Sequence, residues 1–133
     1  MILTIKTYRF TIIWLVIMCY VLFSPASNLP KSSFLNIPHL DKFIHSILFG
    51  VLVFFNFHEN DSINKLSRKL IIIIIFSAFV FAAISELIQN AYISGRAGSI
   101  VDFYADISGC FLGVICYYFV WKNFLQKKLF KIS

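Results

Sequence analysis

Two pairs of ionisable side chains mark the residues of this chain that could do chemistry. Asp41 and His45 are four residues apart, as are Asp102 and Asp106, so each pair would share one face of a helix, about 6 Å apart along its axis. An imidazole beside carboxylates can transfer protons, and the same groups can ligate a divalent cation. Both pairs adjoin strongly apolar sequence, where an unpaired charge is costly, so we expect each of them to need partners.

A third polar segment, between the two pairs in the sequence, carries Glu86, Gln89 and Arg96. Glu86 and Gln89 are three residues apart and so also share a helix face. Arg96 follows in a stretch with two glycines, which is typical of a loop. Its planar guanidinium could grip a phosphate or carboxylate, or it could pair with a nearby acid or extend to the membrane interface.

Four apolar segments must position these side chains. Hydrophobic residues make up 59% of the 133 residues and charged residues only 14%, a balance typical of a membrane protein. A helix needs about 20 residues to cross a bilayer. We predict helices at approximately residues 8–23, 42–57, 69–89 and 101–121, the first two of which need flanking residues to complete a span. The expected fold is therefore an all-α integral membrane four-helix bundle that forms a single domain over residues 1–133. We expect the lipid bilayer as its main partner and no nucleic acid.

The distribution of lysine and arginine predicts how the bundle sits in the membrane, because basic residues concentrate in cytoplasmic segments. Nine of the twelve lie before or at the start of the first helix, between the second helix and the start of the third, or after the fourth. These nine are Lys6, Arg9, Lys65, Arg68, Lys69, Lys122, Lys127, Lys128 and Lys131. Only Lys31, Lys42 and Arg96 fall on the other side. We therefore predict that both termini are cytoplasmic and that the polar segments meet at the outer end of the bundle.

This topology predicts a polar cluster in two layers at the outer end. We expect a lower layer about one helical turn below the membrane boundary and a rim above it. The lower layer consists of His45, Glu86 and Asp106, and the rim of Asp41, Gln89, Arg96 and Asp102. Three separate segments would thus bring polar groups to one place at one depth.

The fourth predicted helix also carries a close-packing motif. Gly109 and Gly113 form a G-x3-G step, which lets another helix approach closely. The two glycines lie on the same stripe of the helix as Asp102 and Asp106. The acidic face should therefore be the packing face and point into the bundle.

Simpler interpretations of single residues remain open. Asp41 and Asp102 lie at helix N-termini, where a carboxylate can cap free N–H groups, and His45 alone could be an interior histidine with satisfied hydrogen bonds. The first apolar segment could also be a cleaved signal peptide, since "SPASN" follows it. We expect no disulfide and no thiolate metal site from the three cysteines, which all fall within apolar segments, namely Cys19, Cys110 and Cys116.

The combined spacing of these residues resembles the VanZ-like family of small bacterial membrane proteins. The pattern is D-x3-H-x3-F followed by E-x2-Q-x6-R-x5-D-x3-[ND]-x2-G-x3-G, and it covers approximately residues 38–118. In this chain it is carried by Asp41, His45, Phe49, Glu86, Gln89, Arg96, Asp102, Asp106, Gly109 and Gly113. The chain departs from the family at Asp106, a position commonly held by asparagine, and the second carboxylate adds negative charge to the cluster.

The resemblance implies a multi-pass protein of the bacterial cytoplasmic membrane. The protein that gives the family its name is associated with resistance to teicoplanin, a glycopeptide antibiotic that acts outside the membrane on cell-wall precursors. The implied function is the binding of a lipid-linked or other anionic cell-envelope ligand at the outward-facing cluster, with an effect on teicoplanin susceptibility. A membrane-embedded acid–base or metal-assisted enzyme acting on a lipid-linked substrate is the alternative. A transporter is a third choice, because four helices make a small transporter unless several copies form a homo-oligomer.

The sequence identifies no cofactor and assigns no set of metal ligands. No nucleophile motif, no H-E-x-x-H and no phosphate-binding glycine loop occurs in the chain. A divalent metal could nevertheless join either function, because five side chains of the cluster offer suitable ligand atoms. These are Asp41, His45, Glu86, Asp102 and Asp106.

Overall fold

All regular secondary structure in the described part of the chain is helical. The computed structural model describes residues 6–25, 39–63, 65–96 and 98–126. Its main elements are α2 (Arg9–Phe23), α3 (Leu40–Ser62), α4 (Arg68–Tyr92), α5 (Ile100–Ile115) and the π-helix η3 (Cys116–Gln126), which continues α5. No strand occurs in these residues, so the predicted all-α class is confirmed.

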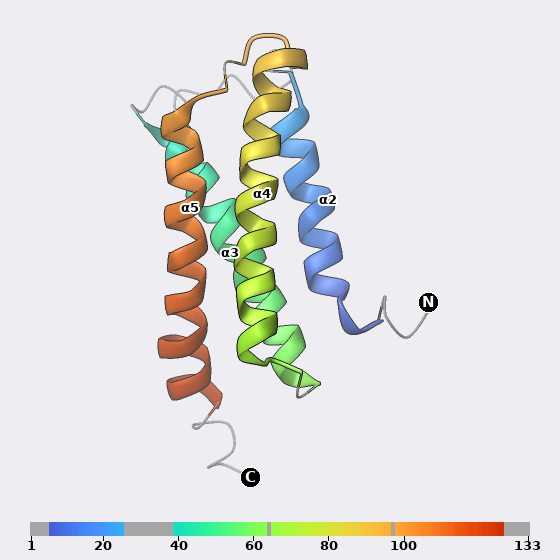
Figure 1. Cartoon of the computed structure of the whole chain (residues 1–133), viewed down its shortest axis with the longest axis vertical. Coiled ribbons are helices and arrows are strands. Elements are labelled where there is room, and N and C mark those ends of the chain that lie inside the picture. Colours follow the sequence, from blue (N-terminus) through green and yellow to red (C-terminus); the bar gives the residue numbers. More distant parts are fainter. Residues whose placement is uncertain (1–5, 26–38, 64, 97, 127–133) are drawn as a thin grey trace.

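The four helices alternate in direction along the chain. In Figure 1, α2 and α4 run toward the end at which α4 passes to α5, and α3 and α5 run back from it. We call this the upper end and the opposite one the lower end. The start of α3, the last turn of α4 and the start of α5 therefore lie near one another at the upper end.

Three of the helices have the length and composition of membrane spans. These spans are Leu40–Ser62, Arg68–Tyr92 and Ile100–Asn123. Many large apolar side chains on their outer faces are exposed, including Ile72, Phe76 and Leu87, which is the surface that a bilayer covers. The chain is therefore a membrane protein. With 15 residues, α2 is about 22 Å long and shorter than the hydrocarbon core of a typical bilayer.

The prediction for the second helix was too short at its C-terminal end. The polar and charged sequence "HEND" at residues 58–61 predicts a loop, but α3 continues to Ser62. The reason is that these polar groups have partners on other helices. Glu59 and Asn60 are buried, and Tyr8 Oη donates a hydrogen bond of 2.9 Å to Asn60 Oδ1.

Glu59 supplies the N-terminal cap that the local sequence of α2 lacks. The first turn of α2 contains no acidic residue, and its N-cap residue Tyr8 makes no side-chain capping bond. Instead, Glu59 Oε1 accepts a hydrogen bond from Phe10 N at 2.7 Å and Oε2 accepts one from Thr11 N at 3.2 Å. A carboxylate at this position satisfies free N–H groups and complements the helix dipole. The short helix α2 is therefore anchored to α3 at its start.

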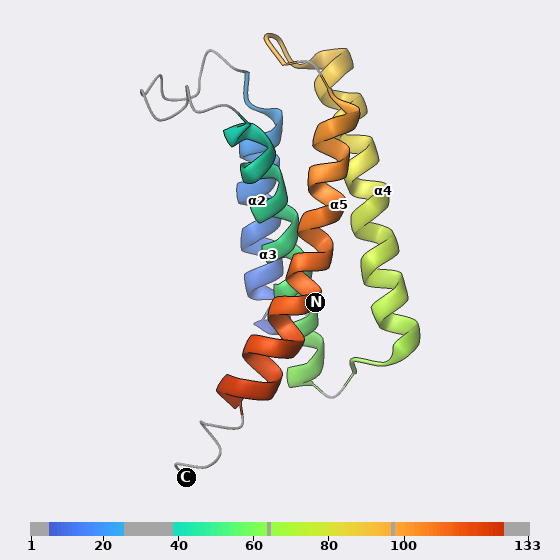
Figure 2. The same cartoon turned by 90° about the vertical axis from the view of Figure 1, so that its left-hand side faces the viewer.

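Backbone contact between α3 and α5 is the closest helix packing in the described chain. A Cβ atom built on Gly109 would lie 2.1 Å from Ser46 O, and one built on Gly113 would lie 2.2 Å from Gly50 O. No side chain fits into such a space, so the two glycines allow the backbones to touch. Figure 2 shows α5 crossing α3, whereas α4 diverges from α5 toward the lower end.

Candidate functional site

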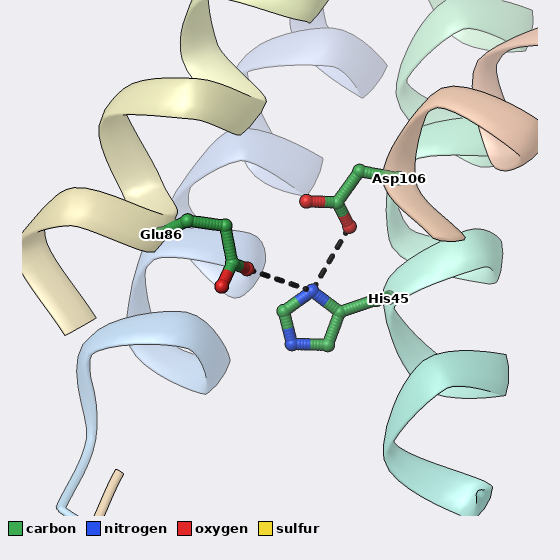
Figure 3. A group of neighbouring side chains, drawn as sticks. All are labelled: His45, Glu86 and Asp106. Carbon is green, nitrogen blue, oxygen red and sulfur yellow. Dashed lines mark hydrogen bonds and ion pairs between the residues drawn. The ribbon is translucent and has the colours of Figure 1, made fainter. Parts of the chain in front are cut away.

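A buried group of three ionisable side chains lies between α3, α4 and α5 near the upper end. His45 Nδ1 is 2.9 Å from Asp106 Oδ1 and 3.5 Å from Glu86 Oε1 (Figure 3). The exposed fractions of His45, Glu86 and Asp106 are 4%, 8% and 0%. Each residue comes from a different helix, so the structure brings the predicted lower layer together. We call these three residues the buried triad.

The glycine contact between α3 and α5 positions two members of the buried triad. Asp106 lies on α5 one turn before Gly109, and Gly109 rests against the backbone of Ser46, the neighbour of His45. Because the two backbones touch here, the side chains of His45 and Asp106 meet directly across the interface. The close approach of α3 and α5 therefore produces both the glycine contact and the pair of His45 with Asp106.

Two carboxylate oxygens of the buried triad have no hydrogen-bond partner in the described chain. They are Glu86 Oε1 and Asp106 Oδ2. The other oxygen of Glu86 accepts a hydrogen bond of 2.8 Å from Ser99 N, which fixes the orientation of this carboxylate. His45 Nδ1 carries at most one proton, so it can donate to only one of the two acids. The buried triad therefore has more acceptors than donors.

The rim above the buried triad contains an ion pair that we did not predict. Lys42 Nζ lies 3.0 Å from Asp41 Oδ2 and 2.9 Å from Asp102 Oδ1, so one cation bridges the starts of α3 and α5. The side-chain cap of α5 is Ser99, whose Oγ accepts a hydrogen bond from Val101 N. In the sequence, only the adjacency of Lys42 to Asp41 could have indicated that Lys42 forms this ion pair.

Gln89 and Arg96 lie at the upper end but tie α4 to the last turn of α2. Gln89 Nε2 donates to Leu22 O at 3.0 Å, and Arg96 Nη2 donates to Val21 O at 2.9 Å. The last carbonyl groups of a helix have no partner within the helix, so these two side chains satisfy groups that would otherwise be unpaired. Neither residue forms an ion pair or a hydrogen bond with the buried triad in the described part of the chain.

Arg96 keeps most of its hydrogen-bonding capacity free. Among the described residues its guanidinium bonds only to Val21 O, although an arginine carries several N–H donors, and its Nε has no partner. The side chain is half-buried. Burial lowers the pKa of the Arg96 guanidinium from its ordinary value, while the carboxylates of Glu86 and Asp102 oppose that shift. Arg96 is thus a cation without a directly bonded carboxylate among the described residues.

A second polar group at the lower end was not predicted. Tyr117 Oη donates a hydrogen bond of 2.5 Å to Asp61 Oδ2, and Lys122 Nζ lies 3.4 Å from Asp61 Oδ1. These contacts join the end of α3 to η3, as Glu59 joins α3 to α2. The signal in the sequence was the polar stretch at residues 58–62, which resembles a linker unless its partners are known.

Fold and site together define a helical membrane protein with a buried histidine–carboxylate group between three of its helices. Residues 8–122 match the family model of VanZ/LLP1, so the chain belongs to the VanZ/LLP1 family. The match confirms the resemblance that residues 38–118 indicated and extends it over α2. No curated protein and no solved structure matches the chain.

Proposed function

We propose that this VanZ-like membrane protein binds a lipid-linked or other anionic cell-envelope ligand at the upper end of the bundle. The polar cluster there would face the outside of the bacterial cytoplasmic membrane. A ligand of this kind would connect the protein to cell-wall precursors, and through them to teicoplanin susceptibility. Arg96 is the residue that meets the anionic group of the ligand.

The free guanidinium of Arg96 is the observation that carries this proposal. Lys42, the other described cation at the upper end, is held by two carboxylates and is not available to a further anion. Arg96 is held instead by a neutral carbonyl, Val21 O, which fixes the side chain without neutralising its charge. A guanidinium in this state can form two parallel charge-assisted hydrogen bonds with a phosphate or carboxylate.

Replacement of Arg96 should weaken binding of a polyprenyl phosphate while leaving the protein folded. We expect Arg96→Ala to raise the Kd about tenfold or more, because hydrogen bonds to charged groups contribute about 1.5–3 kcal/mol each. Arg96→Lys should recover part of the loss, since lysine keeps the charge but not the planar fork. The measurement is binding of a fluorescent polyprenyl phosphate to the purified protein in nanodiscs, with the neutral polyprenol as a comparison.

Gln89→Met is the matched control, because it removes the neighbouring bond from α4 to Leu22 O without touching the guanidinium. If Arg96 only tied α4 to α2, both variants would lose thermal stability and binding together. Unchanged binding of the phosphate by folded Arg96→Ala would rule out Arg96 as the anion contact.

An acid–base enzyme on a lipid-linked substrate is the second candidate, and the contact between His45 and two carboxylates favours it. A carboxylate within hydrogen-bonding distance of an imidazole can orient it and stabilise its charged form during proton transfer. The same assay separates the candidates. For an enzyme, Glu86→Gln should abolish conversion of the substrate at nearly unchanged affinity, whereas for a binding protein no conversion occurs in any variant.

The orientation of the bundle is part of the proposal. We expect the α4–α5 connection to lie outside and the α3–α4 connection to lie in the cytoplasm, and we expect α2 to be retained because Met18 and Leu22 are fully buried in the bundle. In a background without Cys19, Cys110 and Cys116, Ser94→Cys should react with a membrane-impermeant thiol reagent added to intact cells or spheroplasts. Ser62→Cys, at the opposite end, should react only after the membrane is opened. The reverse pattern would invert the proposed orientation.

A further inference from the structure

We propose that the buried triad binds one divalent transition-metal ion, of the Zn²⁺ or Mn²⁺ class, through one ligand atom each of His45, Glu86 and Asp106. This metal site goes beyond the anion-binding function proposed for Arg96. The metal site does not depend on a ligand at Arg96, because all of its proposed protein ligands belong to the buried triad.

The spacing of the ligand atoms fits a small metal ion. One ligand atom from each member of the buried triad lies within 4.8 Å of the other two. Nitrogen and oxygen ligands of zinc lie about 2.0–2.2 Å from the metal, which places neighbouring ligands about 3.3 Å apart in a tetrahedron. The observed distances from His45 Nδ1, 2.9 Å to Asp106 Oδ1 and 3.5 Å to Glu86 Oε1, lie on both sides of that value. To form the site, the ligand atoms of Glu86 and Asp106, at most 4.8 Å apart, would have to approach to the same spacing by side-chain rotation.

The unpaired oxygens provide a second, independent observation. Asp106 is fully buried, yet its Oδ2 has no partner among the described residues, and the same holds for Glu86 Oε1. Buried polar atoms are rarely left without a partner, because the loss of hydration is costly. Both oxygens belong to side chains that converge on His45 (Figure 3). A cation bound between the two carboxylates would give Glu86 Oε1 a partner and would compensate the charge of the Asp106 carboxylate to which Oδ2 belongs.

Charge balance favours a doubly charged cation over a proton on His45. Two carboxylates beside a neutral imidazole carry two negative charges, and an imidazolium would cancel only one of them. The nearest lysine does not help, since Lys42 is already bridged to Asp41 and Asp102. A divalent ion neutralises both carboxylates, which removes most of the cost of holding them among membrane-spanning helices.

The ligand types point to a transition metal, and one contact orients a ligand from outside the site. Carboxylates alone suit Mg²⁺ or Ca²⁺, but an imidazole nitrogen shifts the preference toward zinc and its neighbours. Ser99 N donates to Glu86 Oε2 and so directs Oε1 toward His45. Outer contacts of this kind are typical of metal sites, where they fix the ligand geometry. Three protein ligands would leave a position open for water or a substrate.

The test is metal binding by the purified full-length chain, carried out without a histidine tag. After treatment with a chelator and its removal, the protein in nanodiscs should bind one Zn²⁺ or Mn²⁺ per chain in equilibrium dialysis with elemental analysis. Asp106→Asn should weaken the affinity by more than about 100-fold, because even residues outside the first coordination shell contribute about 10- to 100-fold. Glu86→Gln provides the same test if Asp106→Asn does not fold. The added metal should raise the Tm of the wild type and leave that of either variant unchanged.

Asp102→Asn is the matched control, since Asp102 lies one turn from Asp106 on the same face of α5 but contacts Lys42 and not His45. It should bind the metal as the wild type does. Absence of binding by folded wild-type protein would overturn the proposal, as would unchanged affinity in Asp106→Asn and Glu86→Gln. Equal loss in Asp102→Asn would show that the buried triad is not the ligand set. Because no anionic ligand is present in this experiment, its result does not depend on the role of Arg96.

Discussion

Alanine at Gly109 or Gly113 should destabilise the bundle, although alanine is the better helix former. Inside a helix, replacement of glycine by alanine normally stabilises by about 0.5–1 kcal/mol. At these positions the added methyl group would lie 2.1 Å from Ser46 O or 2.2 Å from Gly50 O. Those atoms are backbone and cannot rotate away, so α3 and α5 must separate. We expect a loss of about 3 kcal/mol or more, at or beyond the upper end of ordinary overpacking.

Gly50 provides an internal comparison for this prediction. Its Cβ would lie 2.9 Å from Gly109 O, so Gly50→Ala should cost less than either substitution on α5. The measurement is the free energy of unfolding in mixed detergent micelles, followed by circular dichroism and by retention of a monodisperse peak. Stabilisation by Gly109→Ala at the level of helix propensity would show that the two backbones are not in contact in the folded protein.

The helix boundaries could be predicted from apolar runs only where a run ends in a polar loop. The first helix was predicted within one residue, because Arg9 and Ser24 bracket a continuous apolar stretch. The second was cut short at Phe57, because Glu59 and Asn60 look like linker residues. Their burial depends on partners in and just before the first turn of α2, some 50 positions earlier. Periodicity within a segment contains no information about such long-range pairs.

The buried triad could be predicted from helical spacing and depth, whereas the partners of the rim could not. His45, Glu86 and Asp106 were placed at one level because alternating helices return the chain to the same end of the bundle. Gln89 and Arg96 were expected near these acids, but they bond to the carbonyl groups of Leu22 and Val21. A backbone carbonyl has the same chemistry at every residue. The sequence therefore cannot show which helix end will accept a given donor.

From the sequence, only the α5 side of the close contact between α3 and α5 could be predicted. The G-x3-G step identified the packing face of α5, but its counterpart on α3 consists of Ser46 and a single glycine, Gly50, in the segment that follows His45. Single glycines are frequent in membrane helices and do not by themselves mark an interface.

Removal of the histidine from the buried triad should be among the most damaging single changes in the chain. His45→Leu keeps a side chain of similar size but leaves Asp106 and Glu86 without their common partner. Removal of one partner from a buried ion pair typically costs about 3–5 kcal/mol, because the remaining charge stays buried without compensation. We expect a loss of this size in the free energy of unfolding, measured with a chelator present so that metal does not contribute.

A second substitution distinguishes lost charge compensation from lost packing. Adding Asp106→Asn to His45→Leu removes one of the stranded charges, so the double variant should be more stable than His45→Leu alone, with a coupling energy of about 0.5–3 kcal/mol. His58→Leu is the control on the same helix, because His58 lies edge-to-face with Trp121, with ring centroids 4.8 Å apart, and forms no ion pair in the described chain. Asp106→Asn should not restore stability to His58→Leu. If the double variant is no more stable than His45→Leu, the ring of His45 acts through its volume, and the two carboxylates do not depend on it for their charge.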